Sequence, residues 1–162
     1  MKKFELTTEF ITNAFGKKLF RIKALVEFGN VKAGELGGYV EKEGNISQGG
    51  NAWVCDDARV YGDAWVCGNA RVYGNAWVSG NARVYGNADY ALVQGFGTEF
   101  RCTTFYRGKN KKIMVNCGCF HGDLEEFRKR VKETRNGKIA KEYLTIADLM
   151  EYHFASEDSS DE

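Results

Sequence analysis

The sequence predicts a mainly β protein built around a parallel β-solenoid, and three observations lead to this. Residues 51–86 consist of six copies of one six-residue unit. Every copy has Ala at its second place and Val at its fourth, and these lie on one side of an extended chain. Asn or Asp opens each copy and Gly closes five of the six, which favours tight turns. Each unit is therefore expected to be a short strand followed by a corner, with small apolar side chains inside.

The spacing of these apolar residues, for example Val60 and Ala64, resembles the hexapeptide repeat of left-handed β-helix proteins. This resemblance implies a left-handed parallel β-helix in which three hexads make one triangular coil. Looser hexads place Leu36 on the Val register and Ile46 on the Ala register. We therefore expect the β-helix to span residues 33–97.

The outward third place of the repeat alternates between Trp and Arg. With three hexads per coil, equivalent positions three hexads apart stack at a spacing of roughly 4.8 Å. Each face would then pair one indole with one guanidinium, a contact that contributes about 0.5–1 kcal/mol when exposed. These pairs either form simple surface ladders or belong to a binding surface, because Trp, Tyr and Arg dominate binding hot spots. The second interpretation predicts a surface of Trp53, Arg59, Trp65, Arg71, Trp77, Arg83, Tyr61, Tyr73 and Tyr85.

Residues 1–32 precede the repeats and are expected to be an N-terminal β cap. Phe20, Ile22 and Ala24 alternate with basic residues, which predicts a half-buried strand. Residues 7–14 are expected to form a short helical turn. An open coil leaves unpaired strand edges, so this segment is predicted to cover the first coil.

Residues 98–154 predict a C-terminal hairpin followed by two helices. Residues 99–106 and 112–116 are the expected strands. Asp123 and Glu126 form a capping box that starts a helix ending near residue 134, and an apolar stripe predicts a second helix over 139–154. The hairpin tip is either a solvated turn or a phosphate contact made by Arg107, Lys109, Lys111 and Lys112. Residues 155–162 are acidic and are expected to be disordered.

A group of cysteines and one histidine allows two interpretations. If residues 117–121 form a strand, their polar side chains share one face, and tetrahedral zinc takes such ligands. The alternative is that the cysteines are reduced, buried small residues, and this alternative predicts no cofactor. The zinc hypothesis comprises Cys102, Cys117, Cys119 and His121.

Composition excludes several classes of protein. The chain has 23 basic and 22 acidic residues, and its four acidic tail residues leave a net charge of +5 (+1 minus −4) for the remainder. This is weak support for nucleic-acid binding, which is therefore not expected. The N-terminus lacks the apolar run of a signal peptide, and no segment is long enough to cross a membrane. A cytoplasmic protein is predicted.

The segments flanking the repeats, residues 19–47 and 116–144, resemble small phage and prophage proteins, which implies a viral context and the cytoplasm of a host cell. Enzymes of the β-helix class include acyltransferases and carbonic anhydrases, which depend on histidines, and this chain has only His121 and His153, both outside the repeats. We therefore expect a non-catalytic protein, a homo-oligomer (a trimer by resemblance) that engages a host protein, for example to counter bacterial defence. The alternatives are a protein that binds or sequesters a nucleotide-like molecule, and a hexapeptide-repeat acyltransferase.

Overall fold

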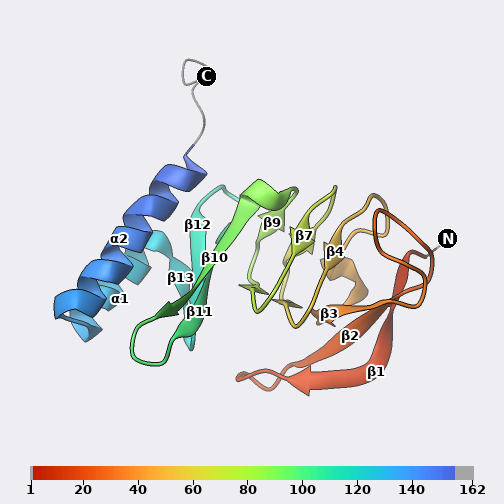
Figure 1. The fold of residues 1–162 in the computed structure, drawn as a ribbon, viewed down its shortest axis with the longest axis horizontal. Coiled ribbons are helices and arrows are strands. Elements are labelled where there is room, and N and C mark those ends of the chain that lie inside the picture. Colours follow the sequence, from red (N-terminus) through yellow and green to blue (C-terminus); the bar gives the residue numbers. More distant parts are fainter. Residues whose placement is uncertain (1, 156–162) are drawn as a thin grey trace, which may run out of the picture.

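The computed structural model describes residues 2–155, and its parts follow one another along the long axis of the molecule (Figure 1). N-terminal strands lie at one end and the repeats lie in the middle. A four-stranded sheet follows, and two helices form the other end. Of the predicted tail, residues 156–162 lie outside the described part of the chain.

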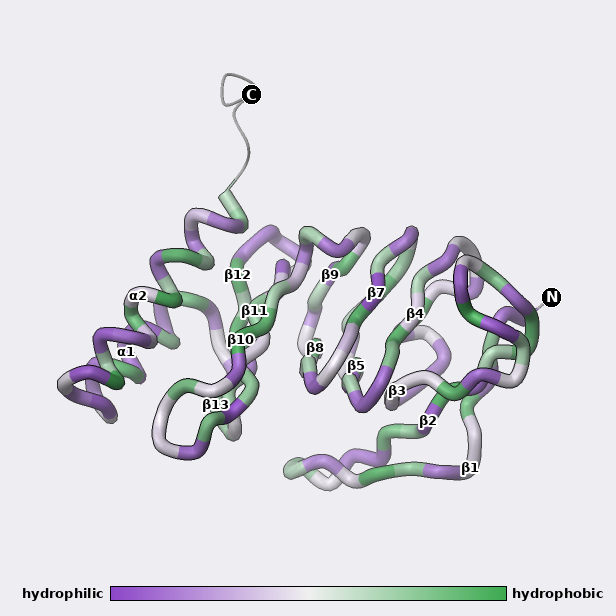
Figure 2. Tube along the Cα trace, viewed as in Figure 1, coloured by the Kyte–Doolittle hydropathy of each residue, from purple (hydrophilic) through white to green (hydrophobic). Residues whose placement is uncertain are grey.

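The hexads form six short strands, each paired in parallel with the strand three hexads away. Trp53 pairs with Arg71, Arg59 with Trp77, and Trp65 with Arg83, which confirms the predicted register. The Ala and Val of every hexad are at most 1% exposed, and hydrophobic and hydrophilic positions alternate at short intervals along these strands (Figure 2). The strands are β4 (Trp53–Val54), β5 (Arg59–Val60), β6 (Trp65–Val66), β7 (Arg71–Val72), β8 (Trp77–Val78) and β9 (Arg83–Val84).

Left-handed backbone conformations turn the corners between these strands. Gly62, Gly68, Gly74 and Gly80 have φ between 62° and 68°. Asp56, which replaces glycine in the first hexad, adopts the same conformation with φ 53°. Its carboxylate accepts a hydrogen bond from the backbone N–H of Gly74, one coil away, at 3.0 Å.

The first coil is two residues longer than the others. Strand β3 (Leu36–Val40) pairs in parallel with β5 and places Val40 beside Val60. Ile46, which follows the short helix η1 (Glu43–Asn45), lies beside Val66 with the same offset along the chain. The predicted registers of Leu36 and Ile46 are therefore wrong. Eight residues separate Ile46 from Val54 where six would fit the period, and Gly50 (φ 64°) helps to turn this longer corner.

The N-terminal residues form a β-hairpin that extends the sheet of the first coil. β1 (Phe4–Thr12) pairs antiparallel with β2 (Lys18–Ala24), and β2 pairs antiparallel with β3. The helical turn predicted over residues 7–14 is wrong. This segment is rich in Thr, Phe and Ile, which favour strands, and Phe10 packs against Phe20 across the hairpin.

The segment after the repeats is a four-stranded antiparallel sheet rather than a two-stranded hairpin. A short helix, η2 (Asn87–Asp89), leads into it, and its first strand is β10, so residues 90–96 belong to this sheet and not to the predicted β-helix. The predicted strands near 99–106 and 112–116 are confirmed within two residues. The sheet consists of β10 (Tyr90–Phe96), β11 (Arg101–Arg107), β12 (Ile113–Cys117) and β13 (Phe120–Asp123).

Two helices cover the face of this sheet that points away from the repeats. α1 (Leu124–Thr134) starts at the predicted capping box, in which Asp123 accepts from the backbone N–H of Glu126 at 2.8 Å. α2 (Gly137–Phe154) follows after a short turn. Alternate residues of the sheet join different cores. Tyr90 and Tyr106 pack with the repeats, whereas Phe105 and Val115 pack with the helices.

Candidate ligand-binding site

The three tryptophans of the repeat occupy different environments. Trp53 is only 2% exposed and packs against Phe4 and Phe28, with ring centroids 6.2 and 5.3 Å away. Arg71, its partner in register, bonds to the side chain of Asn30 instead of stacking on the indole. The prediction that Trp53 belongs to a binding surface is therefore wrong, because the N-terminal residues bury it.

Trp65 is half-buried on a second face of the repeats. Its partner Arg83 turns toward the backbone, where Nη1 donates to the carbonyl oxygens of Asp63 (3.0 Å) and Ala82 (2.9 Å). Lys109 of the β11–β12 turn lines a shallow hollow beside these residues. The face is basic, but the predicted stacking contact between the guanidinium and the indole is absent among the contacts of the described residues.

The third face shows the predicted alternation of cations and aromatic rings. Arg21 (β2), Tyr39 (β3), Arg59 (β5) and Trp77 (β8) follow one another across a single sheet. The guanidinium carbon of Arg21 lies 4.3 Å from the Tyr39 ring centroid, and that of Arg59 lies 4.8 Å from the Trp77 ring. These contacts hold each ring and guanidinium in a fixed orientation.

Trp77 also lines a groove with a volume of about 680 Å³. The N-terminal hairpin runs beneath the repeats toward the C-terminal sheet, so β1 and β11 both contribute to the lining (Figure 1). We call this cavity the Trp77 groove. It is lined by Ile11, Tyr39, Asp57, Arg59, Asn75, Trp77, Arg101, Cys102 and Gly118.

Arginine and glycine shape the end of the groove nearest the C-terminal sheet. Gly118 has φ 59°, and a Cβ built on it would lie 1.8 Å from Nη1 of Arg101. Glycine therefore lets the guanidinium lie across the β12–β13 turn. The hydrogen bond with Glu99 raises the pKa of Arg101. Burial raises the pKa of the Cys102 thiol, which favours its neutral form.

The three tyrosines of the repeat do not form one surface. Tyr61 is half-buried and lines a smaller cavity of about 290 Å³ with Phe15 and Ser79, and burial raises its pKa. Tyr73 and Tyr85 are 44% and 57% exposed and lie at other corners. Neither contributes to the Trp77 groove.

The basic residues near the β11–β12 turn do not converge on one phosphate site. Arg107 bonds to Asp89 at 2.9 Å and to the Phe154 carbonyl at 2.9 Å, so it holds α2 against the sheet. Lys112 pairs with Asp123 at 3.6 Å. Lys111 adopts a left-handed turn conformation (φ 66°), and Lys109 is directed to the Trp65 face.

The predicted zinc ligands lie on opposite faces of the C-terminal sheet. Cys117 packs with the helices, whereas His121 faces the repeats and its Nδ1 lies 2.6 Å from Oδ1 of Asn116. Cys102 lines the Trp77 groove and Cys119 is exposed in a turn. Within residues 2–155 no group of three His, Cys, Asp or Glu residues could hold a metal. The zinc interpretation fails because the chain turns at Gly118, so His121 pairs with Asn116 and shares its face of the sheet, opposite to that of Cys117.

Arg59 and Trp77 are predicted from the sequence, whereas the residues that complete the groove are not. Tyr39 lies outside the strict repeat, and its register is obscured by the longer first coil. The repeat predicts Asp57 and Asn75 only as corner residues. Arg101 and Cys102 reach the groove through the tertiary arrangement of the C-terminal sheet, for which the sequence carries no local signal.

The fold defines the class of protein: it is a repeat β-solenoid protein. The family model described as the YdcK beta solenoid repeat matches residues 52–68, 64–80 and 76–88, so the similarity covers the hexads and not the flanking parts. No curated protein matches the chain. In the described part of the chain, no helix has the length and apolar character needed to span a membrane.

Proposed function

We propose that this protein is a non-catalytic binding protein whose Trp77 groove takes a planar, anionic ligand of the nucleotide class. One observation carries the proposal: an indole and two guanidiniums, those of Arg59 and Arg101, line the same cavity of about 680 Å³. That volume lies within the range of small-molecule sites, about 300–1,000 Å³.

Each part of such a ligand has a matching group in the groove. A nucleobase stacks on the Trp77 indole, and stacking on an aromatic side chain contributes about 1–3 kcal/mol per base. Arg59 and Arg101 supply paired N–H donors for phosphate oxygens. Asp57 and Asn75 offer a hydrogen-bond acceptor and an amide for the polar edge of the base.

The proposal assigns no chemistry to the groove. Neither His121 nor His153 lines it, and its only carboxylate, Asp57, lies 3.4 Å from the guanidinium of Arg21. An acyltransferase or a carbonic anhydrase of this class would need histidine at the site. Binding or sequestration of the ligand is therefore the favoured activity.

Calorimetric titration with cyclic dinucleotides and NAD-derived nucleotides tests the proposal. We expect saturable binding to the wild-type protein, and we expect Trp77→Leu to weaken it at least tenfold. Trp65→Leu is the matched control, because Trp65 occupies the same repeat position on a face outside the groove. Absence of heat with every nucleotide, or equal losses in the two variants, would refute the proposal.

A second candidate is a homo-oligomer, a trimer by resemblance, that engages a host protein. The exposed rings of Tyr73 and Tyr85 favour it, because tyrosine is enriched at protein interfaces. This candidate includes a phage origin, action in the host cytoplasm and a role against bacterial defence. It also assumes the left-handed coil of the β-helix proteins that the repeat resembles. Light scattering tests it: a monomeric mass at all concentrations would exclude the trimer.

A further inference from the structure

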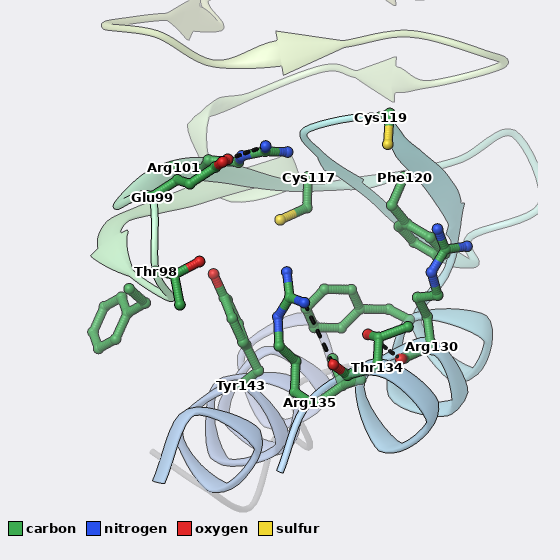
Figure 3. Close-up of a pocket in the computed structure, with 13 residues that line it drawn as sticks. Thr98, Glu99, Arg101, Cys117, Cys119, Phe120, Arg130, Thr134, Arg135 and Tyr143 are labelled. Carbon is green, nitrogen blue, oxygen red and sulfur yellow. Dashed lines mark hydrogen bonds and ion pairs between the residues drawn. The ribbon is translucent and has the colours of Figure 1, made fainter. Parts of the chain in front are cut away.

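A second cavity, separate from the Trp77 groove, lies between the C-terminal sheet and the two helices. Its volume is about 160 Å³. Arg130, Thr134 and Arg135 line it from the end of α1 and Tyr143 from α2, and Figure 3 shows the Arg130 guanidinium at its edge, beside Phe120. On the sheet side lie Thr98, Glu99, Arg101, Cys117, Cys119 and Phe120. We call it the arginine pocket.

The arginine pocket has an excess of positive charge. Its lining contains three guanidiniums and one carboxylate, that of Glu99, which pairs with Arg101. Within residues 2–155, Arg130 and Arg135 form no ion pair with a carboxylate. Arg128 on the same helix differs, because Glu125, Asp148 and Glu151 all pair with it. The two arginines without counterions are thus the two that line the pocket from the end of α1.

The remaining lining strengthens the binding of an anion. Phe96, Phe120, Phe127 and Val131 form an apolar floor, and ionic interactions are stronger beside apolar surface than in bulk water. Tyr143 is 6% exposed, and burial raises its pKa, so its hydroxyl remains a donor at neutral pH. Figure 3 shows this hydroxyl and the Arg135 guanidinium directed toward the sheet side of the cavity.

We propose that the arginine pocket binds a phosphoryl group. Arg130, Arg135 and the Tyr143 hydroxyl supply more donors than the two oxygens of a carboxylate can accept. A phosphoryl group offers three acceptor oxygens and nearly two negative charges. The cavity is too small for a whole nucleotide, so its proposed ligand differs from that of the Trp77 groove, although Arg101 lines both sites.

Calorimetric titration with inorganic phosphate at constant ionic strength tests this assignment. The wild-type protein is expected to bind phosphate saturably, and Arg130→Gln and Arg135→Gln are each expected to weaken binding about tenfold or more. Lys132→Gln is the matched control, since it removes a positive charge from the last turn of α1 outside the pocket and should leave binding unchanged. Arg101 is left intact because it also lines the Trp77 groove.

Both arginines are exposed, so the variants are expected to fold, and circular dichroism of each variant checks this. Absence of saturable phosphate binding would overturn the assignment. So would an affinity for phosphate that is unchanged in the Arg130→Gln, Arg135→Gln double variant, or acetate binding as tight as that of phosphate. Because no groove residue is changed, failure here leaves the function proposed for the Trp77 groove intact.

Discussion

The strand edges at the two ends of the repeats are covered differently. Backbone pairing covers the N-terminal end, whereas side-chain hydrogen bonds form most of the cover at the C-terminal end. At the N-terminal end, β2 pairs with β3 through backbone hydrogen bonds. Lys3 supplements this pairing, because its ammonium donates to the carbonyl oxygen of Ala52 at 2.7 Å and to those of Gly49 and Gly50 at 3.4 Å.

At the C-terminal end the antiparallel sheet forms one isolated backbone bridge with the last coil, between Ala82 and Gly108, and otherwise bonds to it through side chains. The backbone N–H of Trp77 donates to Thr104 Oγ1 at 2.9 Å, and the Asn116 amide donates to the Trp77 carbonyl at 2.7 Å. The Tyr90 hydroxyl accepts from the backbone N–H of Tyr73 at 3.1 Å. A backbone cover tolerates many sequences, whereas a side-chain cover depends on particular residues. Substitutions should therefore cost more at the C-terminal end.

Asn116→Leu should give the largest loss of stability. Asn116 is 4% exposed, and leucine would leave the Trp77 carbonyl without this donor and remove the shorter of the two hydrogen bonds of His121 Nδ1. We expect a cost of about 3 kcal/mol in the free energy of unfolding, measured by urea denaturation. Asn136→Leu, at an exposed position with no side-chain cap bond, is the control. Equal losses of unfolding free energy in Asn116→Leu and Asn136→Leu would contradict the idea that side chains stabilise the C-terminal end of the repeats.

Gly68 and Gly74 both lie at corners of the repeats, but their surroundings differ. A Cβ on Gly68 would lie 2.6 Å from the carbonyl oxygen of Tyr85 in the next coil, whereas a Cβ on Gly74 would meet no atom within 4 Å. Both residues have left-handed φ values, 64° and 62°. Gly74→Ala should therefore cost about 1 kcal/mol from backbone strain alone, and Gly68→Ala about 3 kcal/mol. Thermal unfolding of both variants would show the difference, and identical melting temperatures would argue against stacked corners.

Tyr90→Phe removes a single hydroxyl from the C-terminal cover. The hydroxyl donates to the Arg71 carbonyl and accepts from Tyr73, and phenylalanine keeps the packing of the ring. A loss of about 1–2 kcal/mol is expected, measured by urea denaturation. Tyr152→Phe, which changes an 83% exposed tyrosine, should have no effect. If Tyr90→Phe had the same urea midpoint as the wild-type protein, water would have to replace the hydroxyl as the hydrogen-bond partner.

Lys3 makes the N-terminal end sensitive to pH, an effect that emerges only above about pH 8. Burial lowers its pKa from 10.5 to about 8, so above pH 8 the folded protein releases a proton that the unfolded chain retains up to about pH 10.5. Stability contributed by this group should therefore rise as the pH increases from about 8 to 10.5. Comparing denaturation curves of the wild-type protein and Lys3→Met isolates the effect. Parallel pH profiles for the two proteins would show that Lys3 stays charged when folded.

The repeat itself was predictable from sequence because its structure depends on local spacing. Alternation of Ala and Val with bulky residues, and Gly at each corner, determine the strands and the pairing of Arg59 with Trp77 across three hexads. The capping box at Asp123 was equally local, and α1 begins there. Where the period is interrupted, as between Ile46 and Val54, the same reasoning gave the wrong register.

The candidate sites were less predictable because tertiary packing decides which residues are exposed. Trp53, Trp65 and Trp77 are equivalent in the repeat, yet the N-terminal residues bury Trp53 while the hairpin and the C-terminal sheet enclose a groove at Trp77. Likewise, the zinc hypothesis placed Cys117 and His121 on one face, and the turn at Gly118 puts them on opposite faces.

The repeat has two periods: Trp and Arg each recur at every second hexad, and a regular coil takes three hexads. Together they limit how such a protein can be lengthened by duplication. Duplicating three hexads would bring two like residues into consecutive hexads, and duplicating two would move the C-terminal sheet to another face of the repeats. The smallest insertion that preserves both patterns is six hexads, which is the length of the strict repeat over residues 51–86. Gene duplication can therefore add coils to this protein only in pairs if the ladder and the groove are to survive.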